Sequence, residues 1–214
     1  MLIDELKNIA RNNGIVGAGG AGFPAYAKMT EKADTVILNC VECEPLLKLH
    51  RQLLATHTEE IIQMLDEVRE SFGAKEAVIG IKSEYVTTIK AIEEVIGDFP
   101  NVRICALKAA YPMGDEVVLI YEATGRVIKP GGLPIDENVV VYNVETMYNL
   151  YRAVHLNIPV TNKLVSIVGE IDHPLTVRVP LGTTVKEAIS LAGKITVEDP
   201  AYVMGGPMMG RLGT

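Results

Sequence analysis

Apolar residues recur along the chain with two periods, one typical of helices and one typical of strands. Residues 2–12 place an apolar side chain at every third or fourth position among charged neighbours, which predicts an amphipathic helix. A glycine-rich stretch, residues 14–24, follows this helix. Runs of Val, Ile and Leu predict buried strands at 34–39, 77–81, 102–107 and 139–142. Helical segments alternate with these strands at 45–72, 86–96, 116–123 and 145–155.

The alternation of strands and helices predicts the fold class. Strand and helix units that follow one another along the chain build a parallel sheet with helices on both faces. We therefore expect a Rossmann-like, three-layer α/β domain. Gly73 follows the first long helical segment, at a position where glycine commonly ends a helix.

The pattern changes after residue 163. Two short β-rich runs at 164–168 and 175–179 are joined by a turn, and Thr184 with Glu187 forms the signature of a capping box that opens a short helix. A further short strand is expected at 201–204. These elements predict a small β-grasp module, so we expect two domains, residues 1–160 and 161–214. We also expect the natural protein to continue beyond residue 214.

Composition and charge exclude several classes of function. The formal net charge of -7 offers no basic patch for a nucleic-acid backbone or an anionic membrane surface. No apolar run approaches the length of about 20 residues that crosses a bilayer, and the start lacks the pattern of a signal peptide. Three cysteines, an odd number, do not make a disulfide framework. The sequence therefore predicts a cytoplasmic protein without direct membrane insertion.

A glycine loop is the first candidate for chemistry. Its glycines, which lack a Cβ atom, let backbone N–H groups approach an anion, and Lys28 adds a positive charge. The standard dinucleotide fingerprint requires a strand before the loop, whereas a helix is expected here. We therefore predict a site for a phosphate-bearing ligand, the alternative being a tight structural connection. The loop glycines are Gly17, Gly19, Gly20 and Gly22.

The second candidate follows the first predicted strand, at the edge of a parallel sheet where ligands usually bind. Asn39 offers both a donor and an acceptor, and Glu42 and Glu44 can accept hydrogen bonds from ribose hydroxyls or a cofactor amide. The alternative is that both glutamates are first-turn acids of the following helix.

The cysteines do not form a recognisable metal site. Cys40 and Cys43 make a C-x-x-C pair, and a tetrahedral site needs two more ligands, which Cys105 alone does not supply. The four histidines show no ligand spacing. We therefore predict that the chain binds no metal.

Two further polar clusters also follow predicted strands. Residues 111–116 read Tyr-Pro-Met-Gly-Asp-Glu, and residues 142–146 read Tyr-Asn-Val-Glu-Thr. Glycines, amides, carboxylates and aromatic side chains that converge on one sheet edge are typical of a ligand site.

These motifs, taken in order, resemble those of the flavin-binding subunit family of respiratory complex I. The motifs are the glycine loop with Phe23, the segment from Asn39 to Pro45, and the two clusters above. The sequence of residues 42–48 and 111–117 is closer to the C subunit of Rnf complexes, to cobalamin reductases and to a proline-reductase-associated electron carrier. In this family a soluble-ligand-binding β-grasp domain follows the flavin domain, which matches residues 163–214.

The resemblance implies an electron-transfer flavoprotein subunit that takes hydride from NADH onto FMN. It also implies iron–sulfur clusters only in a part C-terminal to this chain, and a downstream redox partner such as a corrinoid enzyme, a reductase or a membrane complex. Phe23, Glu44 and Glu116 would face NADH. The residues that would hold FMN are Gly17, Gly19, Gly20, Gly22, Lys28, Asn39, Glu42, Tyr111, Gly114, Asp115, Asn143 and Thr146.

Two departures from the complex I pattern leave an alternative open. Complex I subunits carry arginine where this chain has Ala18 and aspartate where it has Val41. The alternative is a docking module without flavin that recruits a corrinoid or a partner protein. A standard Rossmann dehydrogenase is disfavoured, because a strand before Gly17 and a catalytic Tyr/Lys pair or His are not found.

Overall fold

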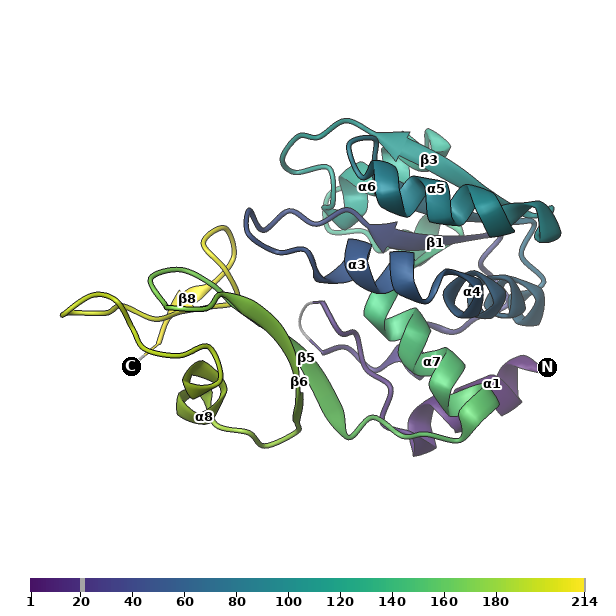
Figure 1. The fold of residues 1–214 in the computed structure, drawn as a ribbon. Helices are drawn as coiled ribbons and strands as arrows, with labels where there is room; N and C mark the ends of the chain where they lie inside the picture. The colour runs from purple at the N-terminus through teal and green to yellow at the C-terminus, as the bar shows by residue number, and fades with distance from the viewer. Residues whose placement is uncertain (20–21, 214) are drawn as a thin grey trace. The chain divides into compact units, whose positions relative to one another are not determined.

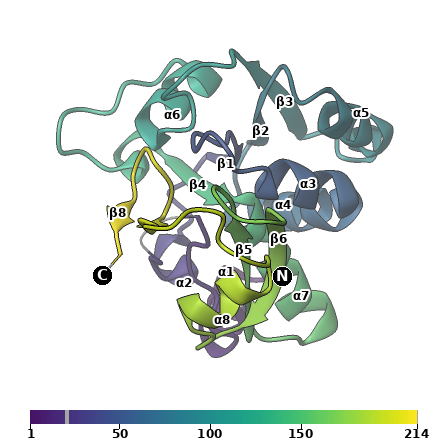
Figure 2. The same cartoon turned by 60° about the vertical axis from the view of Figure 1, so that its left-hand side comes forward.

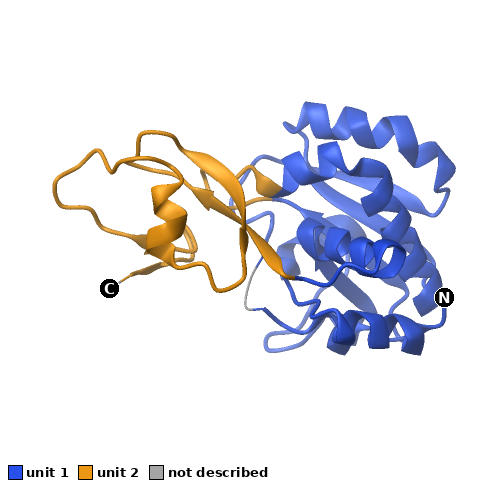
Figure 3. Ribbon diagram, turned by 60° about the horizontal axis from the view of Figure 1, so that its bottom comes forward, with its two compact units in different colours: residues 1–41, 50–160 blue, residues 42–49, 161–214 orange. Residues whose placement is uncertain are grey.

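The computed structural model describes residues 1–19 and 22–213 (Figure 1). The chain forms two compact units (Figure 3). The first contains Met1–Val41 and His50–Val160, and the second contains Glu42–Leu49 and Thr161–Thr214. Residues 42–49 therefore interrupt the first unit in the sequence, but their contacts assign them to the second unit.

The first unit is built on a parallel sheet of four strands, as the alternating pattern predicts. The strand order is β3-β2-β1-β4, so β1 has β2 on one side and β4 on the other. The two central strands are buried along almost their whole length because helices cover both faces. The strands are β1 (Thr35–Cys40), β2 (Glu76–Lys82), β3 (Val102–Leu107) and β4 (Val139–Asn143).

Helices form the outer layers of this unit (Figure 2). Helices α4 and α7 contact each other and β1 on one face, and α6 contacts β2 and β3 on the other face. Leu119 and Ile120 of α6 pack in a cluster with Ile37 and Val78 of the sheet. The helices are α1 (Ile3–Asn12), α2 (Ala25–Lys28), α3 (Leu49–Thr56), α4 (Thr58–Phe72), α5 (Val86–Val95), α6 (Glu116–Thr124) and α7 (Val144–Leu156), with 3₁₀ turns η1 (Ile96–Asp98) and η2 (Pro134–Glu137).

The helix expected over residues 45–72 is wrong in its extent. Helix α3 begins only at Leu49, and the chain breaks at His57, whose φ of -129° is not helical. The hydroxyls of Thr56 and Thr58 donate to the carbonyls of Gln52 and Leu54, at 2.9 and 2.7 Å, and so compete with the backbone for these acceptors. The expected end at Gly73 is confirmed, because this residue is left-handed with φ 68°.

The second unit contains two antiparallel strand pairs and a short helix. Strand β5 (Asn162–Ile167) pairs with β6 (Leu175–Pro180), and β7 (Val203–Met204) pairs with β8 (Arg211–Leu212). Helix α8 (Val185–Ser190) begins with the expected capping box, in which Thr184 and Glu187 bond each other's backbone N–H. The sequence did not predict β8, which is only two residues long.

None of the described helices combines the length and apolar character needed to span a bilayer.

Candidate functional site

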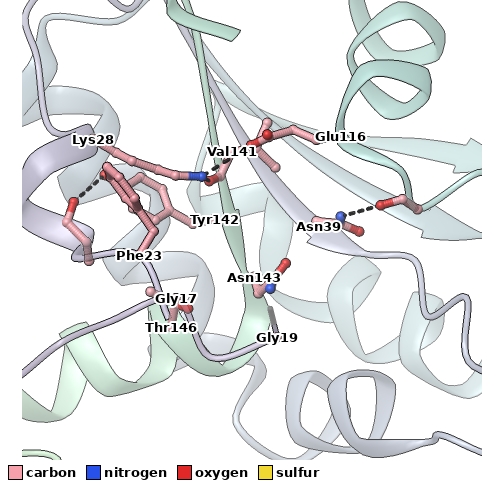
Figure 4. Close-up of a pocket in the computed structure, with 12 residues that line it drawn as sticks. Gly17, Gly19, Phe23, Lys28, Asn39, Glu116, Val141, Tyr142, Asn143 and Thr146 are labelled. Atoms are coloured by element: carbon pink, nitrogen blue, oxygen red, sulfur yellow. Dashed lines mark hydrogen bonds and ion pairs between the residues drawn. The ribbon is translucent and has the colours of Figure 1, made fainter. Parts of the chain in front are cut away.

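The first unit contains an open pocket with a cavity volume of about 230 Å³ (Figure 4). It lies where β1 and β4 end, beside the glycine loop and the start of α6. Its lining residues are Gly17, Gly19, Phe23, Ala25, Lys28, Asn39, Gly114, Glu116, Val141, Tyr142, Asn143 and Thr146. The strand order places this pocket at a topological switch point, because β2 and β4 flank β1 on opposite sides. Such crevices at the carboxyl ends of parallel strands are the usual ligand sites of open α/β sheets.

The glycine loop forms one wall of the pocket. The Gly17 N–H donates to the Phe23 carbonyl at 2.8 Å, which closes the loop at its base. The Ala18 N–H donates to Thr146 Oγ1 at 3.0 Å, so Thr146 of α7 fastens the loop to the sheet edge. Gly22 belongs to the same loop but does not line the pocket as described. Gly20 lies outside the described residues.

Gly19 lies at the point where the loop comes nearest to the sheet. A Cβ atom at this position would collide with the side-chain amide of Asn143 and would lie 3.1 Å from Cε1 of His50. The loop therefore approaches β4 this closely only with glycine at position 19.

Asn39 connects two strand-end segments. Its Nδ2 donates to the Gly114 carbonyl at 3.0 Å, and its Oδ1 accepts the N–H of Val41 at 3.0 Å. This amide therefore fixes both the turn after β1 and the turn before α6. The Cα atoms of Asn39 and Asn143 are partners in the β1–β4 register, so both amides lie at the same end of the sheet.

Lys28 and Glu116 form the charged part of the pocket. Lys28 Nζ lies 3.2 Å from Glu116 Oε1 and 3.4 Å from the Val141 carbonyl oxygen. Both side chains are roughly one-third exposed, at 35% and 40%, so a ligand can reach them. The sequence assigned Lys28 to a phosphate and Glu116 to the nicotinamide side, whereas the structure places them in contact.

Asp115 and Tyr111 do not line the pocket as described. Asp115 is the N-cap of α6, where its Oδ1 accepts the N–H groups of Val117 and Val118 at 3.0 and 3.3 Å. This bond satisfies amides that have no partner within the helix and fixes where α6 begins. Tyr111 has 55% of its surface exposed.

Glu42 and Glu44 belong to the second unit. Glu42 is buried, with 5% of its surface exposed. The alternative that these glutamates are first-turn acids is wrong, because α3 begins at Leu49, five positions after Glu44. The carboxylate of Glu44 accepts hydrogen bonds from the N–H groups of Met208 and Met209.

Sequence reasoning missed the lining residues Ala25 and Val141, and it included Tyr142 in the cluster of residues 142–146 without naming it as a site residue. Tyr142 is 4% exposed, and its hydroxyl donates to the Ala25 carbonyl across 3.4 Å. Burial raises the pKa of this phenol above its usual range, so it stays a neutral donor. The available signal was the position of Tyr142 directly before Asn143, at the carboxyl end of β4.

The cysteine sulfurs form no disulfide among the described residues. The described part of the chain also contains no group of three or more metal-ligating side chains. That the chain binds no metal stays a prediction.

The chain matches the Nuo51 FMN-binding domain family over residues 10–152. It belongs to that family. Residues 164–212 match the SLBB domain, so the expected family and the two-part fold class are confirmed.

Among curated proteins, the chain is 41% identical over 209 residues to the cobalamin reductase PduS of Salmonella typhimurium, covering 98% of this chain and 46% of that protein. It is 32% identical over 212 residues to the C subunit of the Na(+)-translocating ferredoxin:NAD(+) oxidoreductase complex of Acetobacterium woodii, covering 97% and 48%. The chain thus spans about half the length of the curated relatives it matches.

Among solved structures, the fold resembles a chain of an NAD+-reducing [NiFe]-hydrogenase in the H2-reduced state. The TM-score is 0.79 at 22% identity, covering 94% of this chain and 41% of that one.

Proposed function

We propose that the pocket binds FMN and that the bound flavin takes hydride from NADH, as the electron-input part of a larger electron-transfer protein. The observation that carries the proposal is the cradle around Gly19, where a Cβ atom would collide with Asn143, in a pocket that also holds Lys28. Glycine amides and a lysine are the groups that bind a phosphate. The residues present therefore fit a flavin nucleotide.

When bound, FMN supplies a centre that accepts two electrons as hydride and releases them singly. The residues of this chain would bind and orient it. Lys28 would lie beside the anionic end of the ligand. Asn39 would hold the turn after β1 and the turn before α6 in place. Phe23, with 51% of its surface exposed, offers a ring on which a nicotinamide nucleotide can stack.

Glu116 would select the dinucleotide. Its carboxylate lines the pocket and can accept hydrogen bonds from ribose hydroxyls. The extra phosphate of NADPH, on its ribose, would meet this carboxylate, and like charges repel. We therefore expect NADH to be preferred over NADPH, which carries an extra phosphate.

The two departures from the complex I pattern are compatible with flavin binding. Ala18 contributes its backbone N–H to Thr146, and Val41 contributes its backbone N–H to Asn39. Neither contact depends on the side chain at these positions. Ala18 and Val41, which motivated the alternative of a docking module without flavin, therefore keep the backbone contacts that shape the pocket.

The larger role follows from the relatives. Two of them are called a cobalamin reductase and a subunit of a ferredoxin:NAD(+) oxidoreductase complex. We propose that this chain passes electrons through iron–sulfur centres outside it to a downstream redox partner of this kind.

The test is anaerobic titration of the purified chain with FMN, followed by NADH or NADPH. Quenching of flavin fluorescence measures uptake, and bleaching of the flavin absorbance measures reduction. We expect saturable uptake and reduction by NADH at lower concentrations than by NADPH. If the chain takes up no flavin, the docking-module alternative replaces this proposal.

A further inference from the structure

His50, at the start of helix α3, is a buried polar residue with 8% of its surface exposed. It belongs to the first unit, as does the glycine loop. Its Cε1 atom lies 3.1 Å from the position that a Cβ atom would take at Gly19, and the side-chain amide of Asn143 meets the same position (Figure 4). Cε1 is the carbon between the two ring nitrogens. The polar edge of the imidazole therefore faces the glycine loop where this loop comes nearest to the sheet.

Helix α3 is fastened within the first unit, and this holds the imidazole in place. The Thr88 hydroxyl of α5 donates to the Arg51 carbonyl at 3.0 Å. The Arg51 guanidinium lies over the Tyr85 ring, 4.5 Å from the ring centroid. Leu54, one helical turn after His50 and on the same face of α3, is fully buried. The ring is therefore positioned before a ligand arrives, which reduces the cost of binding one.

The charges of the pocket leave a phosphate in need of a further donor. Among the lining residues that the structure describes, Lys28 is the only cation and Glu116 the only acid, and the two are paired at 3.2 Å. The charges of this pair cancel, whereas a phosphate monoester carries about -1.5 to -2 charges at neutral pH. An imidazole offers one N–H donor when neutral, and two donors with a positive charge when protonated. His50 is therefore suited to an anion that lies against the glycine loop.

We propose that His50 is a phosphate-binding residue of this pocket, which donates a ring N–H to the phosphate of FMN beside Gly19. The proposal rests on the proposed function, because the phosphate is that of the flavin nucleotide. It assigns a role to a histidine whose spacing in the sequence gave no sign of one. The imidazole would then distinguish FMN from riboflavin, which has the same isoalloxazine ring and no phosphate. A ring that only packs against the loop would make no such distinction.

The test compares the affinities of FMN and riboflavin for the purified chain, measured by quenching of flavin fluorescence. His50→Leu removes both ring nitrogens, and His50→Gln removes the ring but keeps an N–H donor. We expect His50→Leu to lower the FMN affinity about tenfold or more, for a lost bond to a charged group, and to leave the riboflavin affinity within about twofold. His50→Gln should recover part of the loss. His173→Leu, at an exposed histidine of the second unit, is the matched control and should bind both flavins as the wild type does.

Two results of this comparison would overturn the proposal. Equal losses of affinity for FMN and riboflavin in His50→Leu would mean that the ring only supports the loop. Unaltered FMN affinity in His50→Leu would mean that the phosphate lies elsewhere.

A measurement on the wild-type chain decides the matter even if the variants fold poorly. The Cε1–H resonance of His50 in the NMR spectrum, identified by its absence from the spectra of the His50 variants, should shift on titration with FMN and with inorganic phosphate. Riboflavin should shift it less. If the wild-type chain takes up neither flavin, the proposed function fails. A saturable shift with inorganic phosphate would then still support an anion site at His50, and an unchanged resonance would overturn it.

Discussion

Lys28 of α2 and Glu116 of α6 form an ion pair in the pocket, with Nζ 3.2 Å from Oε1. An anionic ligand and Glu116 therefore compete for the same lysine. A pair this exposed contributes little to stability, because solvent screens it. The pair matters for ligand binding, because Glu116 partly neutralises the charge of Lys28 and Lys28 partly neutralises the charge of Glu116.

Glu116→Gln should separate the two roles of this pair. The change keeps size but removes the charge, so ribose recognition weakens while Lys28 becomes fully available to a phosphate. We expect the NADH concentration for half-maximal flavin reduction to rise about tenfold, for a lost charge-assisted bond, with FMN affinity equal or higher. Stopped-flow reduction and FMN titration measure the two quantities.

Glu122→Gln provides the control for this prediction, because Glu122 is an exposed acid on the same helix. Loss of FMN affinity in Glu116→Gln, or no change in NADH dependence, would show that the carboxylate orients Lys28 rather than the dinucleotide.

Gly19→Ala tests whether the glycine loop binds the phosphate of FMN, because a Cβ atom at this position collides with Asn143 and must displace the loop or the amide. A single methyl group meets the Asn143 amide, so either the loop or the amide must move. We expect FMN affinity to fall about tenfold or more, while the circular dichroism spectrum stays that of the wild type. Gly97→Ala, where a Cβ atom meets no neighbouring atom within 4 Å, is the control and should bind FMN normally. Equal affinity in the two variants would place the phosphate outside this loop.

Asn39→Ala removes one side chain that bonds two backbone groups. The Gly114 carbonyl and the Val41 N–H each lose the hydrogen bond to this side chain, and each loss costs about 1–3 kcal/mol where nothing replaces the bond. We expect lower stability in denaturant unfolding followed by far-UV circular dichroism, together with weaker FMN binding. Asn101→Ala, at an exposed turn, should change neither. Wild-type stability in Asn39→Ala would mean that solvent reaches both groups.

Tyr142 predicts a dependence of stability on alkaline pH. Burial raises the pKa of its phenol above the value of about 10 that holds in the unfolded chain. Above that pH the unfolded state releases the proton and the folded state retains it, so the free energy of unfolding falls by up to about 1.4 kcal/mol per pH unit. Tyr142→Phe should remove this contribution, which denaturant unfolding between pH 9 and about pH 11 measures against the wild type. Parallel pH profiles would contradict the prediction.

Local pattern was enough to predict most of the fold. The runs around Ile37 and Val78 indicate buried parallel strands because both faces of the sheet are covered by helices. The capping box of Thr184 was equally local. The break at His57 was missed, because the apolar period continues across it and the competing hydroxyl bonds of Thr56 and Thr58 leave no mark on that period.

The candidate site was only partly accessible to the same reasoning. Strand ends and glycines indicate which segments meet, so Gly19, Asn39 and Asn143 could be placed at one sheet edge. Which side chains then bond one another depends on distances that no spacing encodes. The pairing of Lys28 with Glu116 and the capture of Glu44 by the loop of β7 and β8 are contacts of this kind.

The strand order also means that the pocket is assembled from segments far apart in the sequence. Strand β1 is made early, yet its neighbour β4 and the Asn143 and Thr146 beside the glycine loop follow only after β2, β3 and their helices. During synthesis the glycine loop is therefore made long before Asn143 and Thr146, which lie beside it in the folded chain. Pairings between segments so far apart in the sequence are slow to form, because a long loop must close first. A flavin that binds this pocket therefore needs β4 in place, and it would stabilise the finished sheet by binding to the folded state.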